Sequence, residues 1–168
     1  MDAAAREQLQ QRLAAAFGGV QAGRDMPVLQ VAPDAVLAAA RRLKQEFAFD
    51  LFASVTAVDW PQRQPRFDVV WHFYSTKTFN RVRMKAQVGV DDPAVDSLTP
   101  LYGAAGFMER ECHEMFGIRF RGNPDLRPIL LYEGFAGHPL RKDYEKTHEQ
   151  PLVPYREFDP AARGDGSA

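Results

Sequence analysis

Two apolar runs joined by a short turn lie between Phe67 and Val90, in the sequence FDVVWHFYSTKTFNRVRMKAQVGV. The first run, 67–75, is rich in aromatic and β-branched residues. The second run, 81–90, alternates apolar and polar side chains, and this period of two is typical of a strand with one buried face. Because a short turn joins the runs, they must pair as antiparallel strands.

The flanking segments extend this hairpin into a sheet packed by helices. Residues 49–60 are almost all apolar or small and predict another antiparallel strand, covered on both faces. A short apolar run predicts a further strand at 28–31. Apolar residues at helical spacing predict four helical segments: 3–17, one opened by Pro33-Asp34 with a buried stripe from Val36 to Phe47, 97–104 and 107–116. The fold class expected is α+β, a two-layer domain with a mainly antiparallel sheet packed by helices.

The character of the sequence changes at Gly117. Four glycines and three prolines lie between residues 117 and 139, so regular structure is not expected there. We therefore expect an α+β domain over 1–117, including a helical Glu-Arg-Glu segment, followed by an extended irregular docking arm over 118–168. The end of the arm carries apolar anchors for a partner, at Leu152, Val153, Tyr155 and Phe158.

Composition excludes several classes of protein. The 168 residues are 45% hydrophobic and 26% charged, with a net charge of -1, which is ordinary for a globular domain and gives no general attraction to nucleic acid. A single cysteine, Cys112, excludes an internal disulfide and argues against an iron–sulfur cluster. No apolar stretch approaches the roughly 20 residues of a membrane span, and the first residues lack the features of a signal peptide. We expect a cytoplasmic, bacterial protein.

Sequence motifs for catalysis are missing from this chain. No dinucleotide-binding or phosphate-binding glycine loop follows a strand. The segment 113–117 begins like a zinc-protease helix, but Gly117 stands where the second histidine would be needed. We therefore expect no catalytic, cofactor-binding or metal-binding residue in this chain.

A charged triplet, Glu109-Arg110-Glu111, lies on the expected 107–116 helix. On a helical wheel the two glutamates flank the apolar stripe, whereas Arg110 points away from it. Carboxylates at such edges are costly to bury unless they are paired. We expect an ion-paired docking surface in which Arg141 is held by Glu111 or Glu109, or by an acidic residue of a neighbouring subunit.

Three other interpretations stay open at this point. The charges can be ordinary solvated surface groups. The chain can be a small free-standing enzyme that uses acid and base groups, with candidates Glu109, Glu111, His113 and His138. The basic strand face can bind single-stranded RNA, through Arg81, Arg83 and Lys85.

The four motifs ERE at 109–111, MFGI at 115–118, FRGNPDLRPIL at 120–130 and GHPLRKDY at 137–144 form one continuous signature. This signature closely resembles the C subunit of NADH-quinone oxidoreductase, in the respiratory complex I family. The chain departs from the family pattern at three positions: Glu114, Asn123 and Pro128 stand where aspartate, histidine and arginine are common.

The resemblance implies a scaffold subunit without a redox cofactor of its own, in the hydrophilic arm of a proton-translocating NADH-quinone oxidoreductase. That complex passes electrons from NADH through FMN and Fe–S clusters to quinone. The implied partners are the D subunit, which helps form the quinone site, and the cluster-bearing B and I subunits, with no nucleic acid. The implied location is peripheral, on the cytoplasmic side of the bacterial inner membrane, with membrane contact only through the complex.

The alternative that this resemblance leaves open is the equivalent scaffold of a membrane-bound energy-converting hydrogenase or formate hydrogenlyase. In either case the signature implies no catalytic residues. It implies a set of subunit-interface and ion-pair residues: Glu109, Arg110, Glu111, Arg127, His138, Arg141, Lys142 and Asp143.

Overall fold

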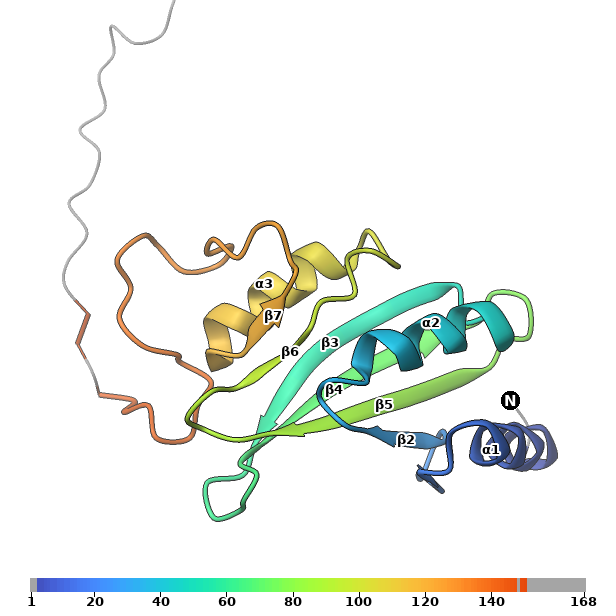
Figure 1. Cartoon of the computed structure of the whole chain (residues 1–168). Helices are drawn as coiled ribbons and strands as arrows, with labels where there is room; N and C mark the ends of the chain where they lie inside the picture. The colour runs from blue at the N-terminus through green and yellow to red at the C-terminus, as the bar shows by residue number, and fades with distance from the viewer. Residues whose placement is uncertain (1–2, 148, 151–168) are drawn as a thin grey trace, which may run out of the picture.

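A computed structural model of the chain describes residues 3–147, 149 and 150 (Figure 1). The elements, in chain order, are α1 Ala3–Phe17, β1 Val20–Gln21, β2 Val28–Val31, α2 Val36–Glu46, β3 Leu51–Asp59, β4 Phe67–Tyr74, β5 Arg81–Val88, β6 Ala94–Asp96, α3 Ala105–Phe116 and β7 Arg119–Arg121. The expected docking anchors beyond residue 150 lie outside the described residues.

The main sheet has five strands in the order β1-β2-β5-β4-β3. Strands β3, β4 and β5 form an antiparallel meander, as the short turns between them require. Strand β2 pairs in parallel with β5. The chain between them, which contains α2, β3 and β4, forms the crossover that a parallel pair requires. The sheet is thus mixed but mainly antiparallel, and the α+β class expected from the sequence is confirmed.

All three helices cover the same face of this sheet. The alternate side chains of β5 that were expected to face inward, from Val82 to Val88, are buried. They join one core cluster with residues from each helix, such as Leu13, Leu43 and Cys112. The other face of the sheet therefore carries the outward side chains of the strands, with none of the three helices packed on it.

Strand β3 differs from the sequence expectation, because it is not covered on both faces. Its exposure alternates, and Leu51 and Val58 are exposed on the outer face. The strand that is buried on both faces is β4, which lies between β3 and β5. Its neighbours cover outward side chains such as Val70, so its position within the sheet, rather than its composition alone, sets its burial.

Two further expectations about the segment after β5 are wrong. Residues 97–104 form turns instead of a helix, with the Leu101 and Tyr102 amides both donating to the Leu98 carbonyl. Regular structure also continues past Gly117, because β7 pairs in parallel with β6. This small second sheet buries Val95 and Phe120, and that burial explains why three residues suffice to form a strand.

Within the described part of the chain, no helix is long and apolar enough to cross a membrane.

Candidate functional site: an arm fastened to helix α3

Within the expected docking arm of 118–168, residues 122–144 run in extended loops over α3 and the end of the sheet (Figure 1). From here on, the arm means these residues, 122–144. Helix α3 ends at Gly117, whose left-handed backbone (φ 73°) places its amide 2.7 Å from the His113 carbonyl oxygen. The chain then reverses through β7 and returns along the helix. The polar residues of α3 fasten this returning segment at several points.

Glu109 makes the first attachment and is fully buried. Its carboxylate accepts hydrogen bonds from the Ser97 hydroxyl at 2.7 Å, the Leu98 amide at 2.7 Å and the Asn123 side-chain amide at 2.8 Å. Burial raises the pKa of Glu109, and these three donors act in the opposite direction. Neutral groups, and not arginines, therefore satisfy this carboxylate and join α3 to the turn before it and to the arm.

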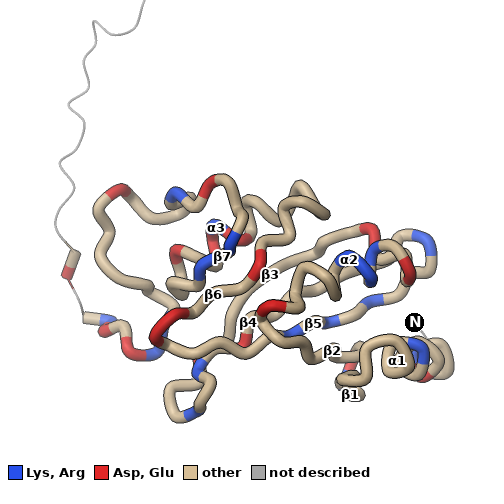
Figure 2. Tube along the Cα trace, viewed as in Figure 1, with Lys and Arg blue, Asp and Glu red and all other residues tan. Residues whose placement is uncertain are grey.

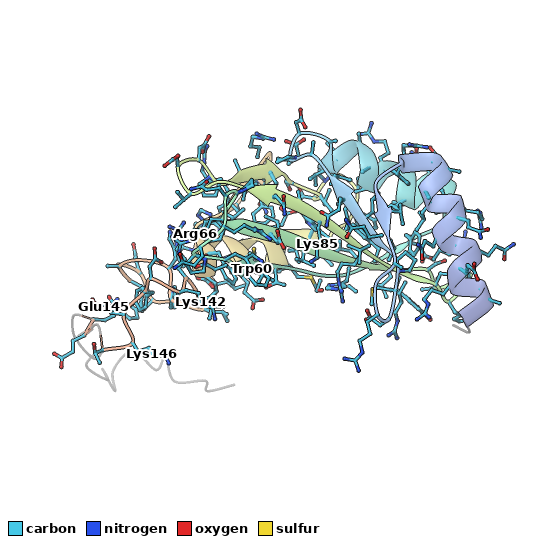
Figure 3. All side chains as sticks on the ribbon, turned by 90° about the horizontal axis from the view of Figure 1, so that it is seen from below. Trp60, Arg66, Lys85, Lys142, Glu145 and Lys146 are labelled. Carbon is cyan, nitrogen blue, oxygen red and sulfur yellow. The ribbon has the colours of Figure 1, made fainter. Side chains whose placement is uncertain are left out.

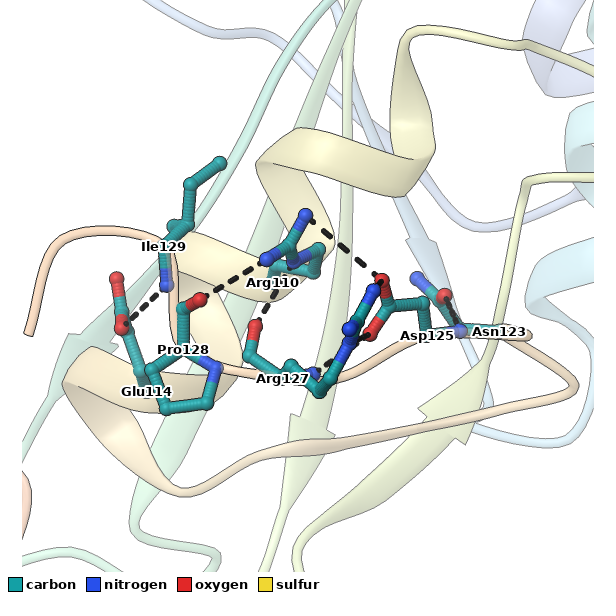
Figure 4. Close-up of polar contacts among 7 residues, drawn as sticks. All are labelled: Arg110, Glu114, Asn123, Asp125, Arg127, Pro128 and Ile129. Atoms are coloured by element: carbon teal, nitrogen blue, oxygen red, sulfur yellow. Dashed lines mark hydrogen bonds and ion pairs between the residues drawn. The ribbon is translucent and has the colours of Figure 1, made fainter. Parts of the chain in front are cut away.

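Arg110 makes the second attachment (Figure 4). Its guanidinium donates to the carbonyl oxygens of Arg127 at 2.8 Å and Pro128 at 2.9 Å, and lies 3.9 Å from the Asp125 carboxylate. Asp125 also accepts the Arg127 side chain at 2.8 Å, and the arginine partners lower its pKa. The second residue of the triplet thus fixes the backbone of the arm at 127–128.

Glu114 makes the third attachment and is 6% exposed. Three consecutive amides, from Ile129, Leu130 and Leu131, donate to its carboxylate at 3.0, 2.9 and 3.3 Å. A carboxylate that accepts several amide hydrogen bonds is a strong, charge-assisted anchor. It holds the backbone here while the Leu130 side chain stays 65% exposed.

The segment 138–141 caps the C-terminal end of α3. The last three carbonyl oxygens of the helix each accept one hydrogen bond: Glu114 from His138 Nδ1 at 2.8 Å, Met115 from the Leu140 amide at 3.1 Å, and Phe116 from Arg141 Nε at 2.6 Å. Carbonyls at a helix end lack partners within the helix, and a cation there interacts favourably with the helix dipole. Burial lowers the pKa of His138 and so favours its neutral ring.

The same segment is bound to the sheet through Asp59 and Arg66. Arg66 donates to both oxygens of Asp59 at 2.7 Å and to Asp143 at 2.8 Å, and the hydrogen bonds from Arg66 lower the pKa of both carboxyl groups. The Lys142 amide completes the cluster with a 2.7 Å bond to Asp59. Arg66 and Lys142 lie together at one end of the sheet, far from α1 and near Trp60, the residue that follows β3 (Figure 3).

The structure thus brings most of the predicted site residues together around the arm, though not in the expected pairs. Glu111 is exposed. Arg141 forms none of the ion pairs found among the described residues and instead caps α3, with its guanidinium 5.2 Å from the centre of the Phe67 ring. The side chain of Arg127 is 82% exposed. Acidic and basic residues are interspersed along the trace of this region (Figure 2).

Sequence reasoning missed four contributors to this site: Asp59, Arg66, Glu114 and Asn123. Asp59 and Arg66 lie outside the signature, about eighty residues before the segment that they bind, and no local pattern links them to it. Glu114 and Asn123 stand out in the sequence only as departures from a family pattern. The signal available for Glu114 is its position beside Met115 and Phe116 on the apolar side of the 107–116 helix, where a carboxylate needs hydrogen-bond partners.

The fold and the site define an α+β domain in which buried charged residues organise an extended surface arm. The described residues contain no group of three or more histidine, cysteine or acidic side chains placed to hold a metal ion. Residues 29–150 match the model of the family described as respiratory-chain NADH dehydrogenase, 30 kDa subunit. The chain belongs to this family. Its relatives from Moorella thermoacetica and Geobacter sulfurreducens are named as the C subunit of NADH-quinone oxidoreductase.

Individual relatives agree with the family match. The C subunit of NADH-quinone oxidoreductase from Moorella thermoacetica is 41% identical over 77% of this chain and 87% of that protein. The C/D subunit of the same enzyme from Bdellovibrio bacteriovorus is 44% identical over 64% of this chain, and the match spans only 19% of that longer protein.

Two solved structures share the fold. The trypsin-resistant fragment (1–134) of Nqo5 has a TM-score of 0.63 and 26% identity, covering 72% of this chain and 99% of the fragment. A chain of the archaeal membrane-bound sulfane sulfur reductase has a TM-score of 0.73 at 23% identity, covering 84% of this chain and 86% of that chain. At that identity the second likeness concerns the fold alone.

Proposed function

We propose that this chain is a scaffold subunit of a proton-translocating NADH-quinone oxidoreductase, on the cytoplasmic side of the bacterial inner membrane. In this role it holds redox-active neighbours in position and binds no redox cofactor itself. The observation that carries the proposal is the fastened arm. Glu109 holds the Asn123 side chain, and Arg110 and Glu114 hold the backbone at 127–131. The side chains of Ile129, Leu130 and Leu140 are nevertheless exposed.

The exposed apolar residues of this region supply the docking surface. They are Phe107 at 66% exposure, Ile129 at 40%, Leu130 at 65%, Tyr132 at 36% and Leu140 at 52%. An extended arm normally loses much conformational freedom when it binds, and this loss weakens the complex. An arm already held by hydrogen bonds has lost that freedom before it meets a partner, so its apolar contacts contribute more fully to binding.

We assign the interface role to the residues that the signature marks. Glu109, Arg110, His138 and Arg141 act indirectly, because they shape the arm. Glu111, Arg127 and Lys142 are exposed and meet a neighbour directly, Arg127 together with the Asp125 carboxylate that it binds. The first partner is the D subunit, because a relative named C/D joins the two names in one chain. The B and I subunits are the further partners in the proposed assembly.

A matched pair of exposed apolar residues tests the proposal. Leu130 lies on the arm and Phe79 lies in the β4–β5 turn, and their exposures are 65% and 68%. Tagged chains with Leu130→Asp or Phe79→Asp would be purified from mildly solubilised membranes. We expect the wild type and Phe79→Asp to retain the B, D and I subunits, and Leu130→Asp to lose them. Equal retention by both variants would contradict the docking role of the arm.

A further inference from the structure

A pocket of about 530 Å³ lies on the outer face of the main sheet, away from the arm. Ser54 of β3, His72 of β4 and Arg83 of β5 stand side by side in its wall. The volume falls within the range of small-molecule sites, which is roughly 300–1,000 Å³. The helices pack on the opposite face, so nothing in the arm or the family signature accounts for this pocket.

The hydrogen bonds of His72 fix which groups of the wall remain free. Arg83 Nε lies 2.8 Å from His72 Nε2, and a guanidinium nitrogen can only donate. His72 Nε2 is therefore an acceptor, and the ring proton sits on Nδ1, 3.0 Å from Ser54 Oγ. Burial and the neighbouring Arg83 charge lower the pKa of His72, in agreement with a neutral ring. Because Ser54 accepts from His72, its own hydroxyl proton is available to a ligand.

The free polar groups of the pocket are mostly donors. Arg83 uses Nε for His72. Among the residues that the structure describes, one carboxylate lies within 4 Å of its outer nitrogens, that of Asp25 at 3.7 Å. Arg81 adds a second guanidinium, which lies 5.7 Å from the centre of the Tyr74 ring. Two guanidinium groups and a hydroxyl, with one exposed carboxylate beside them, favour a ligand that brings negative oxygen atoms.

The rest of the wall is mostly apolar and includes Met26, Leu51 and Ala53. Leu51 is 47% exposed, although it lies beside buried core residues. We propose that this pocket binds a small molecule that carries a carboxylate or a phosphate on an apolar, ring-sized body. The anionic group contacts Arg83, Arg81 and Ser54, and the body covers Leu51 and Tyr74. This inference does not depend on the proposed scaffold role.

Three probes of one shape test the proposal by calorimetric titration of the full chain at pH 7.5 and low salt. They are 2-naphthoate, 2-naphthyl phosphate and the neutral naphthalene-2-carboxamide. We expect at least one anion to bind one site per chain with a submillimolar Kd, and the amide to bind at least about tenfold more weakly. The tighter anion identifies the natural head group as a carboxylate or a phosphate.

Variants connect the binding to the pocket. Arg83→Gln should raise the Kd for the anion at least about tenfold. Ser54→Ala, which leaves the charge of the pocket unchanged, should raise it a few-fold. Lys85→Gln removes a charge from the same strand face outside the pocket and should leave Kd within twofold. If Arg83→Gln does not fold, Ser54→Ala carries the test. Absence of anion binding below 10 mM, equal binding of the amide, or an equal loss in Lys85→Gln would overturn the proposal.

Discussion

Arg141 donates its Nε–H to the Phe116 carbonyl oxygen at 2.6 Å, across 25 residues of sequence. This bond caps the C-terminal end of α3 and holds the last part of the arm against the helix. The sequence predicts instead that the arginine pairs with Glu111 or Glu109, or with an acidic residue of a neighbouring subunit, and neither glutamate of this chain contacts it in an ion pair among the described residues. At this position the positive charge of Arg141 lies at the C-terminal end of α3, where the helix dipole makes the placement favourable.

Alanine substitutions at Gly117 and Gly122 separate the cost of a strained backbone from the cost of displacing the segment that caps α3. Both have left-handed backbones, with φ of 73° and 86°. A Cβ at Gly117 would lie 2.5 Å from His138 Nε2 and would collide with Arg141, whereas a Cβ at Gly122 would meet nothing within 4 Å. Each alanine substitution should cost about 1–2 kcal/mol for its conformation.

Gly117→Ala should therefore lower the free energy of unfolding by at least about 1 kcal/mol more than Gly122→Ala, because it also displaces the cap. Urea unfolding measures both losses. Gly117→Ala should also speed hydrogen exchange of the Leu140 amide, which donates to Met115. Equal free energies of unfolding for the two variants would show that the cap adds nothing to the stability of the fold.

The two glutamates of the triplet should respond very differently to removal of charge. Glu109→Gln places an amide opposite the Asn123 side-chain amide, so one buried donor loses its acceptor. We expect a loss of about 1–3 kcal/mol in the free energy of unfolding. Glu111→Gln, at an exposed position, should stay within about 0.5 kcal/mol of wild type. Similar losses for both variants would contradict the buried network around Glu109.

Glu114 should control the order of the arm and leave the sheet intact. In Glu114→Gln, an amide nitrogen faces the donors of Ile129, Leu130 and Leu131, so at least one hydrogen bond is lost. Hydrogen exchange at these three amides should accelerate at least about tenfold, while β4 and β5 stay protected. Glu133→Gln, an exposed substitution on the same arm, serves as the control. Unchanged exchange at 129–131 would show that Glu114 does not hold the arm.

Acid should weaken the folded protein through His138. Its pKa is lowered in the folded state by burial, so the unfolded chain takes up a proton more readily below its ordinary value of about 6.5. This contribution to stability is present above that pH and is lost as the pH falls through the folded pKa.

His138→Asn should therefore lose less free energy of unfolding than wild type between pH 7.5 and 5.5. The difference is at most about 1.4 kcal/mol per pH unit. The raised pKa of Glu109 acts oppositely but equally in both proteins, so the difference between their urea unfolding curves isolates the histidine. A variant with the same pH slope as wild type would contradict the role of His138.

The sequence predicted local structure well where one pattern determined it. The alternation from Val82 to Val88 indicated the strand and its buried face, and the stripe beginning at Val36 indicated helix α2. The parallel pairing of β2 with β5 and the short strand β7 could not be predicted in this way. Both depend on partners distant in the chain, whose contribution no local window contains.

The site was predictable as a region but not as a set of contacts. A helical wheel placed Glu109 near the apolar stripe, and the structure confirms that it is buried. The wheel gives an angle and does not reveal which loop passes that side of the helix. The partners of Glu109 are thus Ser97, Leu98 and Asn123, and Arg141 serves the helix end instead.

The most direct test of the scaffold role uses Arg141→Ala in the membranes of the host cell. Because Arg141 caps α3 and touches no predicted redox site, its loss should reduce the amount of assembled complex. The measurement is NADH:quinone reductase activity divided by the amount of assembled complex on a native gel. We predict less complex, with activity per complex close to that of wild type. A normal amount of complex with much lower activity per complex would contradict the scaffold role and place Arg141 in the redox chemistry.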